Sequence, residues 1–120
     1  MEFLLQIYSD EKRWAALSEE ESDRAHSAFM AYNQALREAG VHVGGNRLES
    51  TATATVVHVS ADGKTSVHDG PYAETKEQLG GYYLIDVADL DAAIAWAARC
   101  PGASYGKIEV RPIAPVPARV

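Results

Sequence analysis

The sequence is poor in cysteine and has no long apolar run, and these two absences exclude several classes of protein. Cys100 is the only cysteine, so no disulfide can form within the chain and no oxidising compartment is needed. The apolar start at residues 3–5 is interrupted by Gln6 and Asp10, far short of the ~18 apolar residues that suggest a membrane span. We therefore expect a cytoplasmic protein with no export segment and no membrane partner.

Basic residues are also scarce, because 11 Lys and Arg stand against 17 Asp and Glu and leave a formal net charge of −6. This balance repels nucleic acid and anionic lipid, so no nucleic-acid partner is expected. Apolar residues are plentiful: 47% of the 120 residues are hydrophobic. A chain of this length can bury one core but not two, which predicts a single globular domain over residues 1–120.

Hydrophobic periodicity predicts an alternation of strands and helices. Period-two or β-branched runs predict strands at residues 3–8, 41–48, 52–59, 65–68, 82–87 and 107–113. A helix is expected over 19–39, because Ser18 and Glu21 can form a capping box ahead of an apolar stripe. A second helix is expected over 90–99. The Asp62-Gly63 pair predicts a tight hairpin turn between two of the strands.

This order of elements is the split β-α-β plan of a ferredoxin-like α+β fold, with two helices on one face of an antiparallel sheet. Strand parity assigns one face, expected under the helices, to Phe3, Leu5, Ile7, Tyr83, Ile85, Val87, Ile108 and Val110. The opposite face receives Leu4, Gln6, Tyr8, Tyr82, Leu84, Asp86, Glu109 and Arg111. Two helices cannot cover both half-apolar faces, so we expect a two-fold homodimer in which the uncovered faces meet around a cleft.

Residues 69–81, Asp-Gly-Pro-Tyr-Ala-Glu-Thr-Lys-Glu-Gln-Leu-Gly-Gly, form a distinctive segment, which we call the motif segment. It resembles the signature of the YCII-related domain, in the subfamily marked by Asp-Gly-Pro-Phe, with Tyr72 in place of the phenylalanine. The similarity extends through residues 83–87, 91–97, 100–101 and 109–113. The resemblance implies a ferredoxin-like fold that pairs into a dimeric α-β barrel, and it implies no established activity.

The resemblance does not carry a catalytic site with it. Some YCII-like proteins have a His-Asp pair that is proposed to act as an acid and base. Here Cys100 precedes Pro101 where those proteins have the aspartate, and Phe29 stands at about the position of their histidine. Cys100 follows a helix C-terminus, where the dipole raises a thiol pKa, so we expect it to be packed and unreactive.

Three residues are candidates for acid-base chemistry within this chain. His26 lies at the edge of the apolar stripe of the first helix, and His68 and Asp69 adjoin the motif segment. Adjacent residues of a strand point in opposite directions, so Asp69 is expected to cap a turn rather than to pair with His68. The four histidines lack the spacing of metal ligands, and no phosphate-binding signature is present, so neither a metal nor a cofactor is expected.

Seven residues are candidates for ligand binding. They are Tyr8, Tyr82, Glu109 and Arg111 of the uncovered face, with Tyr72, Glu74 and Lys76 of the motif segment. Arg111 can grip an anion, although Glu109 on the same face can neutralise it. The leading hypothesis is a homodimer that binds a small polar or anionic aromatic molecule beside the motif segment. The alternatives are a lyase or hydrolase with a histidine base, and a non-catalytic regulatory or interaction subunit.

Overall fold

The computed structural model describes residues 1–116, and its elements follow the expected alternation. In chain order they are β1 (Glu2–Ser9), α1 (Glu11–Ala15), α2 (Glu19–Glu38), β2 (His42–Arg47), the 3-10 turn η1 (Thr51–Thr53), β3 (Thr55–Val59), β4 (Thr65–Asp69), β5 (Gln78–Asp86), α3 (Leu90–Arg99), α4 (Gly102–Tyr105) and β6 (Lys107–Pro112).

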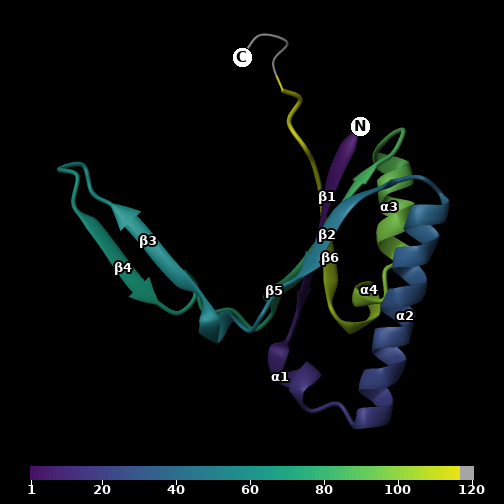
Figure 1. Cartoon of the computed structure of the whole chain (residues 1–120), viewed down its shortest axis with the longest axis horizontal. Helices are drawn as coiled ribbons and strands as arrows, with labels where there is room; N and C mark the ends of the chain where they lie inside the picture. The colour runs from purple at the N-terminus through teal and green to yellow at the C-terminus, as the bar shows by residue number, and fades with distance from the viewer. Residues whose placement is uncertain (117–120) are drawn as a thin grey trace.

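Four of these strands form one antiparallel sheet in the order β2-β5-β1-β6. The long helices α2 and α3 both lie on one side of this sheet (Figure 1). This arrangement confirms the predicted ferredoxin-like α+β fold. Along the chain, the hairpin of β3 and β4 lies between β2 and β5, and it forms a separate two-stranded sheet.

The core lies between the sheet and the two helices, on the face that strand parity predicts. Phe3, Leu5 and Ile85 are each at most 1% exposed, and Leu36 of α2 and Ala93 of α3 pack on them at 0%. Burying side chains of this size stabilises a fold by roughly 1.5–3 kcal/mol each.

Polar groups inside this core are satisfied by hydrogen bonds. The Tyr32 hydroxyl donates to the Trp96 carbonyl at 2.7 Å, and the Tyr83 hydroxyl donates to Asn33 Oδ1. Burial raises the pKa of Tyr83 to about 12 and raises the pKa of Tyr32 further.

The helix α2 begins where its capping box predicts. The Glu21 N–H donates to Ser18 Oγ and the Ser18 N–H donates to Glu21 Oε1, each at 3.1 Å. The hydrogen bonds from Ser18 hold the pKa of the Glu21 carboxyl below its usual value. Gly40 follows the helix with a φ of +70°, a left-handed conformation that suits glycine after a helix end.

Two helices and the starts of two strands differ from the prediction by more than one residue. The short helices α1 and α4 were not expected, because five or four residues are too few to show apolar periodicity. The strand β5 begins at Gln78 rather than at Tyr82, so Gly80 and Gly81 lie in a strand that bulges opposite Ile7 and Tyr8. The 3-10 turn η1 replaces the start of the predicted strand at 52–59, since Ser50 Oγ caps it by accepting from the Ala52 N–H.

The β3–β4 hairpin projects away from the rest of the chain as an arm, which we define as residues 55–69; the other described residues form the body (Figure 1). The predicted turn at its tip is present, with Gly63 at a φ of +84°. The radius of gyration is 16.9 Å, whereas a compact chain of this length has about 14 Å. The arm is therefore an extended feature without a core of its own.

Cys100 is packed as expected, with 1% of its surface exposed, and burial raises the pKa of its thiol. Among residues 1–116, no helix combines the length and apolar character that crossing a membrane requires.

Candidate functional site

No helix of residues 1–116 covers the sheet face opposite α2 and α3 (Figure 1). We call it the open face; its thirteen residues, read from the strand register, are Glu2, Leu4, Gln6 and Tyr8 of β1, Leu79, Tyr82, Leu84 and Asp86 of β5, Gly44 and Asn46 of β2, and Lys107, Glu109 and Arg111 of β6. The apolar members Leu4 and Leu84 face each other at its centre, and the charged members Asp86 and Arg111 are exposed. The predicted membership of this face is confirmed.

Gln6 occupies the middle of the open face, opposite Tyr82 on one side and Glu109 on the other. Its Oε1 is buried and accepts no hydrogen bond from residues 1–116. A buried acceptor left unpaired costs roughly 1–3 kcal/mol, so a donor supplied by a molecule on this face would be favourable.

A hollow lies at one end of the open face, between the motif segment, α1 and β6. Its lining consists of Tyr8, Asp10, Arg13, Thr75, Lys76, Glu77, Tyr105, Lys107, Ile108 and Glu109. These residues come from three stretches of the chain that are distant in sequence, 8–13, 75–77 and 105–109, so the tertiary fold assembles the hollow.

The charges of the hollow are balanced but not all paired. Lys107 forms a salt bridge with Glu77 at 2.5 Å, and the Arg13 guanidinium donates to the Tyr105 carbonyl at 3.3 Å. Lys76 makes no salt bridge with any residue of 1–116. Its ammonium group is therefore available to an anionic group of a bound molecule.

Aromatic packing beside the hollow fixes the positions of α1 and α4. The rings of Trp14 and Tyr105 lie 4.7 Å apart, and the Trp14 indole donates to Ser9 Oγ at 2.7 Å. Gly106 lies directly against the end of β1, where an added Cβ would overlap the carbonyl oxygen of Tyr8. The Tyr105-Gly106 pair thus ties the wall of the hollow to the end of the sheet.

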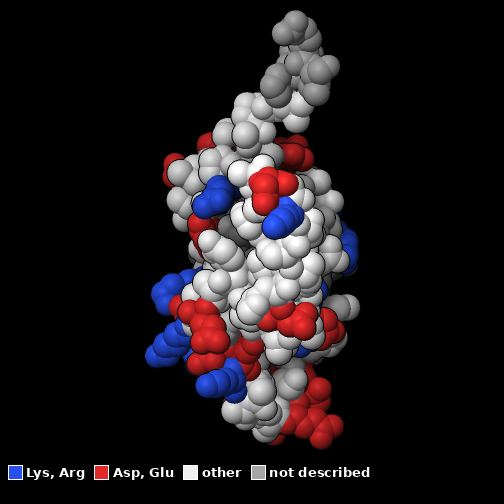
Figure 2. All heavy atoms as spheres, turned by 90° about the vertical axis from the view of Figure 1, so that its left-hand side faces the viewer, with Lys and Arg blue, Asp and Glu red and all other residues white. Residues whose placement is uncertain are grey.

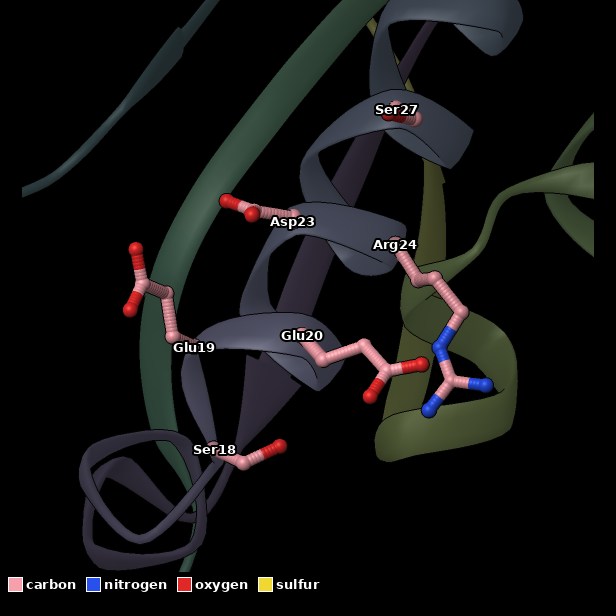
Figure 3. Close-up of a pocket in the computed structure, with 6 residues that line it drawn as sticks. All are labelled: Ser18, Glu19, Glu20, Asp23, Arg24 and Ser27. Atoms are coloured by element: carbon pink, nitrogen blue, oxygen red, sulfur yellow. The ribbon is translucent and has the colours of Figure 1, made fainter.

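A second hollow lies along the start of α2 and has a different character. Its lining is Ser18, Glu19, Glu20, Asp23, Arg24 and Ser27, all from one helix and its cap (Figure 3). Figure 3 shows Glu19 and Asp23 pointing to one side of the helix and Glu20 and Arg24 to the other. No other element of residues 1–116 lines this hollow, and Ser18 is already engaged in the cap, so this surface is a solvated helix face rather than a site.

The structure separates the seven predicted ligand-binding residues into three groups. Tyr8, Lys76 and Glu109 line the hollow. Tyr82 and Arg111 lie on the open face outside it, where the Tyr82 hydroxyl accepts from Asn46 Nδ2 at 2.9 Å and Arg111 pairs with Glu109 at 3.3 Å. Tyr72, 90% exposed, and Glu74, also exposed, point into solvent.

The three predicted acid-base residues are not brought together. His26 is exposed on α2, on the helix side of the molecule, whereas His68 and Asp69 belong to β4 of the arm on the opposite side (Figure 1). Asp69 ends β4 opposite Thr55, while His68 is opposite Val56, so their side chains point to opposite faces of the arm. Asp69 does not cap a turn as expected, because it is paired in the strand and makes no side-chain hydrogen bond within residues 1–116.

Several residues of the hollow were not predicted from the sequence, chiefly Arg13, Tyr105 and Lys107. Arg13 and Tyr105 belong to α1 and α4, the two helices that periodicity did not detect. A signal for α1 was present, since Asp10 caps it by accepting from the Lys12 N–H at 2.9 Å. Lys107 has the same strand parity as Glu109 and Arg111 and could have been assigned to their face.

Fold and site together define a ferredoxin-like α+β domain with one open sheet face and a polar hollow beside the motif segment. Comparison with known proteins then gives the family: the YCII-related domain matches residues 1–117, and the chain belongs to that family. A relative from Rhizobium meliloti (strain 1021) is 43% identical over 116 residues, which cover 95% of this chain and 93% of that protein; it is described as an uncharacterised protein.

Proposed function

We propose that this chain acts as a cytoplasmic homodimer, paired through the open face, that binds a small polar aromatic molecule with an anionic group in the hollow. The observation that carries the proposal is the position of Lys76 and Tyr8 in one hollow at the end of the open face. We also assign the chain to the Asp-Gly-Pro-Phe subfamily, on the basis of the motif segment.

The open face supports the dimer. Leu4, Leu84 and Tyr82 are half-buried although no helix covers them, and a second copy would remove their remaining surface from water. A second copy would also place donors near Gln6 Oε1, which lacks one. If the two-fold axis of the dimer passes close to Gln6, the amide N–H₂ of each copy can donate to the other copy's oxygen.

The hollow supports the ligand class. Lys76 offers a cation without a salt-bridge partner among residues 1–116, and Tyr8 offers a ring and a hydroxyl. The carboxylates of Asp10 and Glu109 disfavour a highly charged anion, since their negative potential opposes it. A ring with one carboxylate and one hydroxyl group matches this combination best.

Calorimetric titration with benzoate, salicylate and 4-hydroxybenzoate tests the proposal. We expect saturable binding of at least one of them, weakened about tenfold by Lys76→Ala, because an ion pair in a partly enclosed site contributes on the order of 1 kcal/mol. Lys64→Ala is the matched control, since that lysine is at the tip of the arm with 85% of its side chain exposed. Absence of binding, or equal affinity of the Lys76→Ala variant, would refute the ligand.

A further inference from the structure

The arm presents an apolar surface that nothing in residues 1–116 covers. Val57, Val59 and Val67 are 61%, 57% and 65% exposed. Val57 is directly opposite Val67, and Val59 is two residues further along the same strand, so the three side chains share one face of the hairpin, which we call the valine face.

Charge is confined to the ends of the arm. Asp62 and Lys64 lie in its turn and Asp69 at its base, and the strand residues between them carry no Asp, Glu, Lys or Arg. Figure 2, which looks at the molecule from the side of the arm, accordingly shows uncharged atoms along the centre and charged groups toward the ends. An uncharged strip of this kind is typical of a contact surface rather than of a solvated loop.

The arm cannot hold its conformation by burial within one chain. Nine of its ten strand residues are exposed, and β3 and β4 pair only with each other. An isolated two-stranded hairpin is at best marginally stable in water. A surface outside the described chain is needed to cover the valine face.

The arm stands on the same side of the sheet as the open face. Figure 1 shows α2 and α3 on one side of the sheet and the arm on the other, inclined away from the sheet. The extent along the line of view is 18 Å, which is the width of four strands spaced ~4.8 Å apart. A molecule that seats on the open face therefore also meets the arm.

The base of the arm is fastened to the body, which gives the arm a defined direction. Glu11 Oε1 accepts from the Thr51 N–H at 2.8 Å, and Glu11 Oε2 accepts from the Thr51 and Ser50 hydroxyls at 3.1 and 3.3 Å. The Glu11 N–H in turn donates to Gln78 Oε1 of β5 at 3.0 Å. At the point where the arm joins the body, the Gly70 N–H donates to the Ala54 carbonyl at 2.7 Å.

The size of the open face identifies the occupant. Its thirteen residues fall short of the roughly 20–30 residues that each partner contributes to a stable interface. The six arm residues whose side chains lie on the side of the valine face, namely Thr55, Val57, Val59, Thr65, Val67 and Asp69, bring the total close to the lower limit of that range. A second copy supplies both missing parts at once, because two-fold symmetry gives each copy one open face and one arm.

We propose that the arm clasps a second copy of this chain, with the valine face buried against that copy while the open faces meet. The inference rests on the proposed homodimer and adds an exchange of arms to it. The dimer then depends on two separate surfaces of each chain.

Sedimentation velocity at micromolar concentration tests the proposal with the intact chain. Val57→Asp/Val67→Asp places two charges on the valine face, and we expect it to weaken dimerisation at least about tenfold, since buried unpaired charges are unfavourable at an interface. His58→Asp/Ser66→Asp is the matched control, because those residues face the other side of the same hairpin, and it should leave the dimer unchanged. Leu84→Asp, on the open face, should produce monomers.

Each outcome discriminates between the two levels of the proposal. An unchanged dimer in the valine variant, with dissociation by Leu84→Asp, overturns the clasp and leaves the dimer through the open face intact. Equal weakening by the control variant overturns the assignment of the valine face. A wild-type chain that stays monomeric overturns both.

Hydrogen–deuterium exchange supplies a readout that does not depend on assembly constants. In the wild-type dimer we expect slow exchange across residues 55–69, and in the monomeric Leu84→Asp variant exchange there close to the unfolded rate, while β1 and β5 stay protected. Equal protection of the arm in monomer and dimer contradicts the clasp.

Discussion

The strands β1 and β3 are both rich in branched apolar residues, yet they lie in opposite surroundings. In β1, Phe3, Leu5 and Ile7 alternate with half-buried neighbours and are at most 8% exposed. In β3, Val57 and Val59 alternate with neighbours in the same way and are more than half exposed. Alternation therefore identifies a strand with two different faces, but it does not say whether the same chain covers the apolar one.

Truncating one apolar side chain in each strand tests this difference in burial most directly. Leu5→Ala should lower the free energy of unfolding by about 3 kcal/mol, because it leaves a cavity at a fully buried position. Val57→Ala should change it by less than about 0.5 kcal/mol in a chain kept monomeric by Leu84→Asp. Urea denaturation of both variants measures the difference, and similar losses at the two positions would contradict the distinction between body and arm.

The next largest loss of stability is expected at Gly106, where α4 packs against the end of β1 beside the hollow. Gly106→Ala should destabilise the chain by roughly 1–3 kcal/mol, because the new Cβ overlaps the Tyr8 carbonyl oxygen and must separate α4 from β1. Gly63→Ala, at the tip of the arm, meets no atom within 4 Å, and its cost comes from the left-handed φ alone. Thermal unfolding compares the two, and an undisturbed melting temperature for Gly106→Ala would show that the wall of the hollow can shift freely.

The smallest expected effect is a loss of stability of the body at alkaline pH. The folded-state pKa of Tyr83 is raised to about 12 by burial, above the ordinary tyrosine value of about 10 in the unfolded chain. The unfolded chain therefore loses this proton first, so the stabilising contribution is complete below pH ~10 and declines as the pH rises toward 12.

A variant isolates this contribution. Tyr83→Phe should make the dependence of unfolding free energy on pH less steep in that window, although Tyr32, whose pKa burial also raises, still contributes to it. The variant also loses the hydrogen bond to Asn33 at all pH values. Tyr72→Phe is the matched control, because its side chain is 90% exposed in the motif segment. A slope that is the same in the wild type and Tyr83→Phe would rule out the buried hydroxyl as its source.

Much of the body was predictable because its signals are local. The capping residues Ser18 and Glu21 predict the start of α2 within four residues, and the Asp62-Gly63 pair predicts the hairpin turn. The alternation in β1 correctly separates Leu5 from Leu4 between the two faces of the sheet. Each of these signals depends on neighbours in the chain, so no tertiary information is required to read it.

The candidate site was predictable only in part, because it depends on contacts between distant residues. Tyr8, Lys76 and Glu109 were expected from parity and from the motif segment, and they do line the hollow. Arg111 was expected either to hold an anion or to be neutralised by Glu109, and it pairs with Glu109 on the open face. Arg13 and Tyr105 were not predicted, since their helices are too short to show apolar periodicity and pack against each other through Trp14 and Tyr105.

Local signals in the sequence fix the alternation of strands and helices, the split β-α-β plan and the two faces of the sheet, because hydrophobic period and capping residues act over one or two turns of chain. The separation of the β3–β4 hairpin from the four-stranded sheet is visible only in the tertiary structure. The same holds for the pairing of Glu77 with Lys107 and for the attachment of the base of the arm by Glu11. These two contacts join residues thirty or more positions apart, and their geometry is set by the packing of the whole body.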